Sequence, residues 1–153
     1  MGTALKIYTD GGCKGNPGPG GWAYVIIMQT FQGENIIAQE KGGAKNTTNN
    51  KMELTAVIGA LKKLKTMSVP RQVTVYTDSQ YVQKGISEWI KKWKRNSWRT
   101  SDRRPVKNQE LWIELDSLIG DFLINWQWIK GHAGNEYNEL CDQMTNEAIA
   151  EIF

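Results

Sequence analysis

Five short stretches of the chain are rich in β-branched or aromatic residues, and this pattern predicts five β-strands. The first three stretches are separated only by short linkers, so we expect them to form antiparallel hairpins. The fourth stretch is a nearly continuous apolar run, which is typical of a strand buried on both faces. The predicted strands span residues 5–9, 22–29, 35–42, 73–77 and 125–130.

Apolar residues at helical spacing follow the third strand, and they predict amphipathic helices over residues 52–65, 108–119 and 136–152. Two shorter helical pieces are expected at 79–84 and 87–93, and residues 96–106 are expected to be irregular. The polar run at 47–50 supplies N-capping side chains for the first helix. This order of elements predicts an α/β fold, in which one mixed sheet carries helices on its faces. No linker divides the chain, so we expect a single domain over residues 1–153.

Charge is distributed unevenly along these elements. The 153 residues are 40% hydrophobic and 23% charged, as in an ordinary globular protein, and the net charge is only +3. Residues 84–107, however, contain nine basic and two acidic residues, a net charge of +7, whereas the remaining residues sum to −4. Trp89, Trp93 and Trp98 lie among these cations. Cations beside aromatic rings favour binding of a nucleic-acid strand; the alternative is a solvated helix whose tryptophans pack inward.

Two predicted strands lead into the same three residues, Tyr-Thr-Asp, which place Asp10 and Asp78 just past a strand. Ligands of α/β sheets gather at the carboxyl ends of the strands. Two such aspartates on strands that are able to be neighbours therefore indicate a site, although each is also a suitable turn or helix cap.

Glu53 shares a helix face with four apolar residues, namely Val57, Ala60, Leu61 and Leu64. A carboxylate near a core is costly unless it is paired or binds a metal ion, although in the first helical turn it also interacts favourably with the helix dipole. If Asp10, Glu53 and Asp78 converge, their like charges require a cation, and the oxygen ligands favour Mg²⁺ or Mn²⁺ over zinc.

Two other residues are weaker candidates on their own. Asp142 has polar helical neighbours, so a solvated helix face explains it. His132 is the only histidine of the chain, and the glycines beside it suit a proton carrier without establishing one.

Cys13 and Cys141 form neither a zinc motif nor a disulfide framework, so we expect reduced thiols and a cytoplasmic location. The N-terminal residues lack the pattern of a signal peptide, and no apolar run predicts a membrane span.

Five blocks of residues follow one another across nearly the whole chain. They are Tyr8-Thr9-Asp10-Gly11 with Cys13 and Gly15-Asn16-Pro17-Gly18, Thr48-Asn49-Asn50-Lys51-Met52-Glu53-Leu54, Thr77-Asp78-Ser79-Gln80-Tyr81-Val82, Trp128-Ile129-Lys130-Gly131-His132-Ala133-Gly134, and Asn138-Glu139-Leu140-Cys141-Asp142. In this order they resemble ribonuclease H of the bacterial type 1 family, and Pro105-Val106-Lys107-Asn108 with Leu111-Trp112 matches as well.

The resemblance implies a ribonuclease H-like fold, a five-stranded mixed sheet in the order 3-2-1-4-5 with helices on both faces. It implies a monomeric endonuclease that hydrolyses the RNA strand of an RNA/DNA hybrid and leaves 5′-phosphate and 3′-hydroxyl ends. Two Mg²⁺ ions, or Mn²⁺ as a substitute, would be held by Asp10, Glu53, Asp78 and Asp142. By the same match, His132 would assist proton transfer on the leaving side.

The resemblance also implies contacts with both strands of the substrate. Asn16, Asn49 and Gln80 would contact the RNA strand, and Thr48 a phosphate. A basic, Trp-containing protrusion around residues 84–107 would hold the DNA strand through Trp89, Lys91, Lys92, Trp93, Lys94 and Arg95. The chain departs from the family at Asn46 and Lys92, which stand where members often carry Arg and Asn in a pocket for a DNA phosphate.

Three other functions remain open from the sequence. A binding module of the same fold without activity is disfavoured because all four carboxylates are present. A nuclease or integrase of the same superfamily that acts on DNA is disfavoured by the Asn16, Asn49 and Gln80 set together with the basic tryptophan-bearing segment. A Mg²⁺-dependent phosphatase on small phosphoesters is disfavoured by the +7 charge of residues 84–107.

Overall fold

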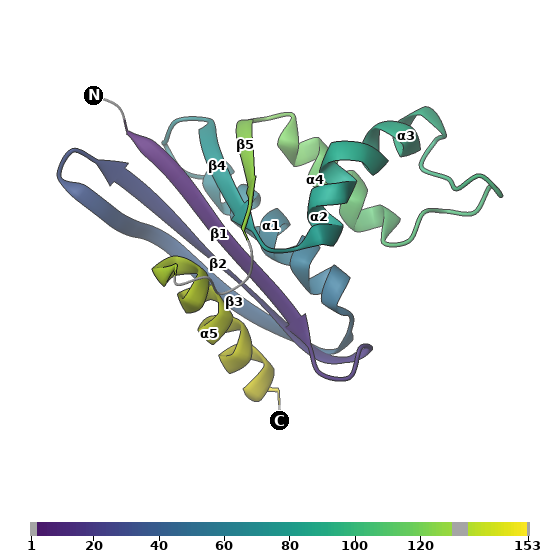
Figure 1. Ribbon diagram of the computed structural model, residues 1–153, viewed down its shortest axis with the longest axis horizontal. Helices are drawn as coiled ribbons and strands as arrows, with labels where there is room; N and C mark the ends of the chain where they lie inside the picture. The colour runs from purple at the N-terminus through teal and green to yellow at the C-terminus, as the bar shows by residue number, and fades with distance from the viewer. Residues whose placement is uncertain (1–2, 130–134, 153) are drawn as a thin grey trace.

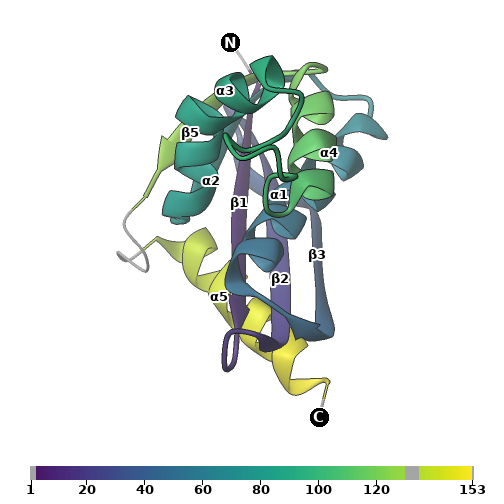
Figure 2. The same ribbon diagram turned by 90° about the vertical axis from the view of Figure 1, so that its right-hand side faces the viewer.

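The computed structural model of the protein describes residues 3–129 and 135–152. Its strands form one five-stranded sheet in the order β3-β2-β1-β4-β5, and helices cover both faces (Figures 1 and 2). The strands β1 (Ala4–Cys13), β2 (Gly18–Thr30) and β3 (Gly33–Thr47) form an antiparallel meander. The strands β4 (Gln72–Thr77) and β5 (Leu123–Trp128) run parallel to β1. The predicted fold class and strand order are confirmed.

The first three strands are longer than the hydrophobic pattern predicts. We expected the glycine-rich residues after Thr9 to form a turn, but Gly11 pairs with Trp22 and Gly12 with Gly21 in the sheet. Asp10 therefore lies inside β1, paired with Ala23, and the prediction that it follows the strand is wrong. The sequence pattern misses this extension because glycine has no side chain to contribute to the alternation.

The helices divide between the two faces of the sheet. One face carries α1 (Asn49–Lys65), against which α4 (Gln109–Ile119) packs, and the opposite face carries α5 (Glu136–Ala150) over β1, β2 and β3 (Figure 2). The polar run before α1 acts as predicted, because the side chain of Thr48 accepts a hydrogen bond from the N–H of Lys51. No helix of the described residues is long and apolar enough to cross a membrane.

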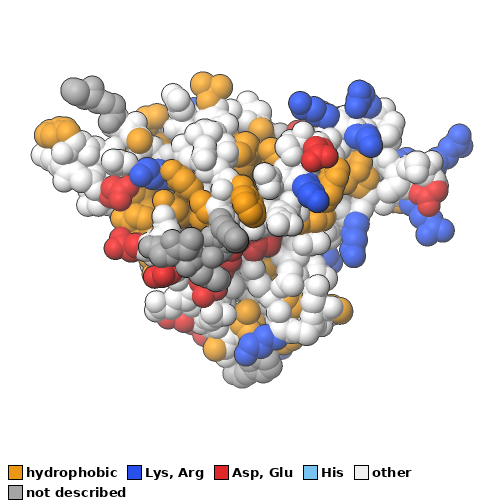
Figure 3. All heavy atoms as spheres, viewed as in Figure 1, with side chains coloured by type: hydrophobic (Ala, Val, Ile, Leu, Met, Phe, Trp, Pro, Cys, Tyr) orange, Lys and Arg blue, Asp and Glu red, His pale blue; other side chains and the backbone are white. Residues whose placement is uncertain are grey.

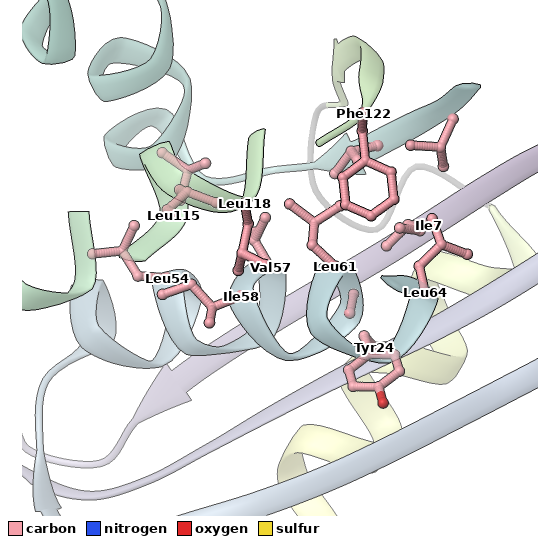
Figure 4. Close-up of a cluster of buried hydrophobic side chains, with 14 of the residues drawn as sticks. Ile7, Tyr24, Leu54, Val57, Ile58, Leu61, Leu64, Leu115, Leu118 and Phe122 are labelled. Atoms are coloured by element: carbon pink, nitrogen blue, oxygen red, sulfur yellow. The ribbon is translucent and has the colours of Figure 1, made fainter. Parts of the chain in front are cut away.

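The main hydrophobic core lies between α1, α4 and the sheet (Figure 4). All four apolar residues that share the helix face of Glu53 are fully buried, as the helical spacing predicts. A second cluster lies beneath α5 and contains Tyr8, Val25, Cys141 and Met144. The strand β1 is consequently packed on both faces, which fixes the position of its carboxyl-terminal half.

The chain between β4 and α4 leaves the sheet and extends to the right in Figure 1. It contains α2 (Gln80–Lys84), a π-helical turn η1 (Gly85–Trp89), α3 (Ile90–Arg95) and an irregular segment up to α4. The two predicted helical pieces and the irregular segment are confirmed, and the π-helical turn joins the two pieces without a break. We call residues 84–107 the handle.

Candidate active site

The pairing of β1 with β4 brings two aspartates to one edge of the sheet. Ile7 pairs with Val75 and Tyr8 with Tyr76 in parallel register, and the two tyrosine rings stack with centroids 4.5 Å apart. Asp10 and Asp78 each follow their tyrosine by two residues. The repeated Tyr-Thr-Asp sequence therefore places the two carboxylates at equivalent positions, with Asp10 inside β1 and Asp78 directly after β4. Ser79 is the N-cap of α2, so the capping function that the sequence left open belongs to Ser79.

The second turn of α1 brings Glu53 to the same place, because the helix begins at Asn49 and not at residue 52 as predicted. This turn packs directly on Gly11, where an added Cβ would lie only 2.5 Å from the backbone nitrogen of Glu53, so the close approach requires glycine. The N–H of Gly11 donates to Oε1 of Glu53 at 2.7 Å. The hydrogen bond holds the Glu53 carboxylate beside β1.

Asp10, Glu53 and Asp78 each offer a carboxylate oxygen, and these three atoms lie within 4.8 Å of one another. Asp10 is 7% exposed and Glu53 is 8% exposed. The second oxygen of Glu53, Oε2, is buried and has no hydrogen-bond partner within the described residues. Buried carboxylates with an unpaired oxygen suit a divalent cation, and a donor set made only of oxygen suits Mg²⁺ or Mn²⁺.

The pKa shifts of the buried carboxyl groups also indicate a cation site. Burial, followed by the charges of Asp78 and Asp142, raises the pKa of Asp10 to about 7, while the Thr145 hydroxyl and the Gly11 N–H act in the opposite direction. Burial, together with Asp10 and Asp78, raises the pKa of Glu53 well above its ordinary value. A cation among these groups would reverse both shifts because it favours the ionised carboxylates.

The fourth predicted ligand, Asp142, comes from α5. It is half-buried, and its charge raises the pKa of Asp10. The side-chain nitrogen of Asn146 lies 3.5 Å from Oδ2 of Asp142, one helical turn further along. His132 lies outside the described residues, so its role stays a prediction from the sequence.

The four residues predicted to contact the RNA strand or a phosphate belong to segments that adjoin the carboxylates. Oδ1 of Asn16 accepts a hydrogen bond from the N–H of Asn49 at 3.1 Å, which joins the loop after β1 to the start of α1. Thr48 is half-buried at the N-cap of α1, and Gln80 is exposed at the start of α2, two residues after Asp78. Asn16 and Asn49 are also exposed, so three amide side chains are available to a ligand next to the carboxylates.

The tryptophans of the handle form a continuous group of rings. The ring centroid of Trp93 lies 5.7 Å from that of Trp89, 6.2 Å from that of Trp98 and 5.5 Å from that of Trp112. Trp89, Trp93 and Trp98 are half-buried against the main core, whereas the nucleic-acid interpretation of the sequence assumed exposed rings. The inward packing that we kept as the alternative is therefore present in part, because the core extends into the handle.

The cations of the handle lie on its outer surface, and most of the basic side chains in Figure 3 gather there. Lys91, Lys92 and Arg95 are exposed without an acidic partner among the described residues, whereas Lys94 pairs with Asp116 at 3.3 Å. A recess of about 430 Å³ opens between α3 and the irregular segment. Its lining combines aromatic rings with cations, including Trp89, Lys92, Trp93, Arg99 and Lys107.

Two of these recess residues, Arg99 and Lys107, were not singled out from the sequence. Both were counted in the basic segment, but an irregular segment has no period from which the direction of a side chain is predicted. The Gly11 N–H was missed for a related reason, because we assigned Gly11 to a turn. Its place directly after Asp10 in a glycine-rich run was the available signal.

Comparison with known proteins identifies the group to which this arrangement belongs. A sequence model described as RNase H matches residues 2–150. The chain belongs to the ribonuclease H family. The family predicted from the ordered motifs is thus confirmed, and with it the prediction that the chain is a nuclease.

Relatives within the ribonuclease H family match this chain over nearly their whole length. Ribonuclease H of Treponema denticola is 52% identical, with 97% of this chain and 98% of the relative covered. Ribonuclease H of Cupriavidus pinatubonensis is also 52% identical, with 95% of each chain covered.

Solved structures of the family share the fold. LC9-RNase H1, a type 1 RNase H with the type 2 active-site motif, has a TM-score of 0.85 at 28% identity, with 97% of this chain and 72% of that chain covered. LC11-RNase H1 in complex with an RNA/DNA hybrid has a TM-score of 0.71 at 26% identity, with 97% and 98% covered.

Proposed function

We propose that this ribonuclease H family member hydrolyses the RNA strand of RNA/DNA hybrids and leaves 5′-phosphate and 3′-hydroxyl ends. The observation that carries the proposal is the buried carboxylate cluster, in which Glu53 keeps an unpaired oxygen beside Asp10 and Asp78. The RNA/DNA hybrid bound to LC11-RNase H1 supports the choice of substrate.

Two divalent ions, Mg²⁺ in the first place, are the proposed cofactors. Asp10, Glu53, Asp78 and Asp142 would hold them, and the raised pKa values of Asp10 and Glu53 support this because these buried carboxyl groups lie beside other negative charges. When bound, the ions would activate the attacking water and stabilise the negative charge on the leaving oxygen. The carboxylates would hold the ions in place relative to β1. His132 would supply or accept a proton on the side of the leaving oxygen.

The amide side chains beside the carboxylates would identify the RNA strand. A 2′-hydroxyl both donates and accepts hydrogen bonds and distinguishes RNA from DNA. The side chains of Asn16, Asn49 and Gln80 carry both kinds of group and are exposed at the site. Thr48 would contact a phosphate. Since these contacts go to sugar and phosphate, we expect little dependence on base sequence.

The handle would bind the DNA strand. Its exposed lysines and arginines suit phosphates, and the accessible parts of Trp89 and Trp93 suit sugars or bases. Lys94 would contribute less than Lys91, Lys92 and Arg95, because it already pairs with Asp116. We further propose that residues 1–153 form one domain with the handle as its protrusion, since the family match extends over residues 2–150.

A cleavage assay with matched duplexes tests this function. End-labelled RNA/DNA hybrid, RNA duplex and DNA duplex of one sequence are incubated with the protein in Mg²⁺ or in EDTA, with a small phosphomonoester as a further substrate. We expect cuts only in the RNA strand of the hybrid, only with Mg²⁺, and with 3′ ends that a polymerase extends. Cleavage of duplex DNA, or equal cleavage in EDTA, would contradict the proposal.

A further inference from the structure

The helix α5 packs closely on the sheet over a pair of glycines. Gly12 of β1 and Gly21 of β2 are direct partners. A Cβ added to Gly21 would lie 2.7 Å from the carbonyl oxygen of Thr145, and one added to Gly12 would lie 3.7 Å from Cγ2 of Thr145. The two glycines thus leave the space in which Thr145 rests on the sheet.

Asp10 lies on this same face of the sheet. It pairs with Ala23, which is buried in the cluster beneath α5, and directly paired residues of antiparallel strands share a face. Gly12 follows Asp10 by two residues, which returns the strand to the same face. On the face beneath α5, the pair Gly12–Gly21 therefore comes directly after the pair Asp10–Ala23. Thr145 lies over Gly12 and Gly21, next to the Asp10 carboxylate.

The hydroxyl of Thr145 has no partner within its own helix. Thr145 is 2% exposed, and its Oγ1 makes no hydrogen bond of ordinary geometry within the described residues, not even to the carbonyl one turn back in α5. The hydroxyl nevertheless lies close enough to Asp10 to lower the pKa of its carboxyl group. Buried hydroxyl groups are nearly always paired, so this one points to the neighbouring carboxylate as its partner. Thr145 also follows Asp142 by three residues, so the two share a side of α5.

We propose that Thr145 is a positioning residue of the metal site, whose hydroxyl donates a hydrogen bond to the Asp10 carboxylate and fixes the orientation in which Asp10 meets the cation. Carboxylates that bind metal ions are themselves oriented by hydrogen bonds from surrounding groups, and loss of such a partner typically weakens metal binding or activity by roughly 10–100-fold. The inference rests on the proposed function, because it assumes that Asp10 binds the cation.

Two substitutions separate the hydroxyl from the methyl group of Thr145. Thr145→Val keeps the shape and removes the hydroxyl, whereas Thr145→Ser keeps the hydroxyl and removes the methyl group that faces Gly12. Thr145→Ala serves as a second removal of the hydroxyl should the valine variant fail to fold. For each protein we would titrate Mn²⁺ by calorimetry without nucleic acid, record metal-free melting, and measure kcat and KM on the hybrid.

We expect Thr145→Val to bind Mn²⁺ roughly 10-fold more weakly and to lose kcat by a similar factor, with KM for the hybrid and metal-free melting nearly unchanged. Thr145→Ser should bind Mn²⁺ like the unmodified protein while melting at a lower temperature. Wild-type Mn²⁺ binding by Thr145→Val, or equally weak binding by Thr145→Ser, would overturn the inference and leave the proposed function standing. If the unmodified protein neither bound Mn²⁺ nor cut the hybrid, the proposed function would fall and the inference with it.

Discussion

The carboxylate cluster and the handle arrange charge in opposite ways. The cluster gathers like charges from β1, α1 and the end of β4, and two of its members are buried. The handle is one continuous stretch of chain in which the rings pack inward and the cations face solvent. Exposed like charges cost little because water and salt screen them, whereas buried ones cost much. The cluster therefore needs a cation to be stable with all of its charges, which agrees with the proposal that the cluster is reactive and the handle binds substrate.

Removing one charge from the cluster should give the largest effect. Asp78→Asn keeps the shape of the side chain but withdraws an ionised ligand, so we expect kcat to fall by roughly 10³-fold or more, on the scale of losing a preorganised stabilising group. Hybrid affinity, measured by fluorescence anisotropy in Ca²⁺, should change less than about threefold because the handle is intact. A variant with near-normal turnover in Mg²⁺ would show that Asp78 is not a ligand.

His132→Ala tests whether proton transfer belongs with the cluster. We expect kcat to fall by roughly 10²-fold, the lower part of the range for general acid–base catalysis, with little change in KM or in the Mg²⁺ concentration required. The measurement is the kcat of the folded fraction, with melting temperature recorded on the same sample. A destabilised variant with full turnover would mean that His132 has only a structural role.

Changing the handle should alter affinity and leave chemistry nearly intact. Joint replacement of Lys91, Lys92 and Arg95 by Ala should raise KM by roughly 10-fold and reduce the salt dependence, with a log–log slope smaller by up to about 0.9 for each lost phosphate contact. Lys62→Ala is the matched control, because Lys62 is exposed on α1 and pairs with Glu114. A large fall in kcat with an unchanged salt slope would contradict the proposal that the handle binds the substrate and the carboxylate cluster carries out the reaction.

The smallest effect concerns the stability of the metal-free protein. The pKa of Asp10 is about 7 in the folded state and near its ordinary value of 3.8 in the unfolded chain. Between these values the folded protein holds a proton that the unfolded chain releases, so stability falls as pH rises from about 4 to 7. Asp10→Asn should therefore raise the metal-free unfolding free energy by on the order of 2 kcal/mol at pH 8 and by almost nothing at pH 4. Urea unfolding in EDTA at both pH values measures this, and an equal change at both would rule out charge repulsion as the cause.

The same two regions differ in how far their sequences predict them. The repeated Tyr-Thr-Asp and the apolar face shared with Glu53 indicated a site and raised the convergence of three carboxylates as a condition, because strand pairing and helical spacing are regular. The family resemblance turned that condition into a prediction. The extension of β1 through Gly11 and Gly12 was not predictable from alternation, since glycine leaves no hydrophobic signal. Thr145 was missed because the closeness of α5 depends on glycines in two other elements.

In the handle, the sequence predicted the charge and the helical pieces, but it left the burial of the rings open as an alternative. Trp112 of α4 packs against Trp93 of α3, a contact between residues far apart in the chain that no local period contains. The recess lined by Arg99 and Lys107 depends on that packing and on the irregular segment. Tertiary contacts decide such features, and from a single sequence they are predictable only through resemblance to a known family.

The central position of β1 determines which parts of the protein unfold first. It is paired along both edges and covered on both faces, so its amide protons should exchange with solvent only when the whole domain unfolds. The only β-bridge of the handle among the described residues, between Arg99 and Pro105, lies within the handle itself. The handle is held to the rest of the protein by the packing of its rings against the core, without pairing to the sheet, so it should open at a lower free energy than β1. Under mild denaturant the protein should therefore first lose substrate binding by the handle. The carboxylate cluster should stay assembled until global unfolding.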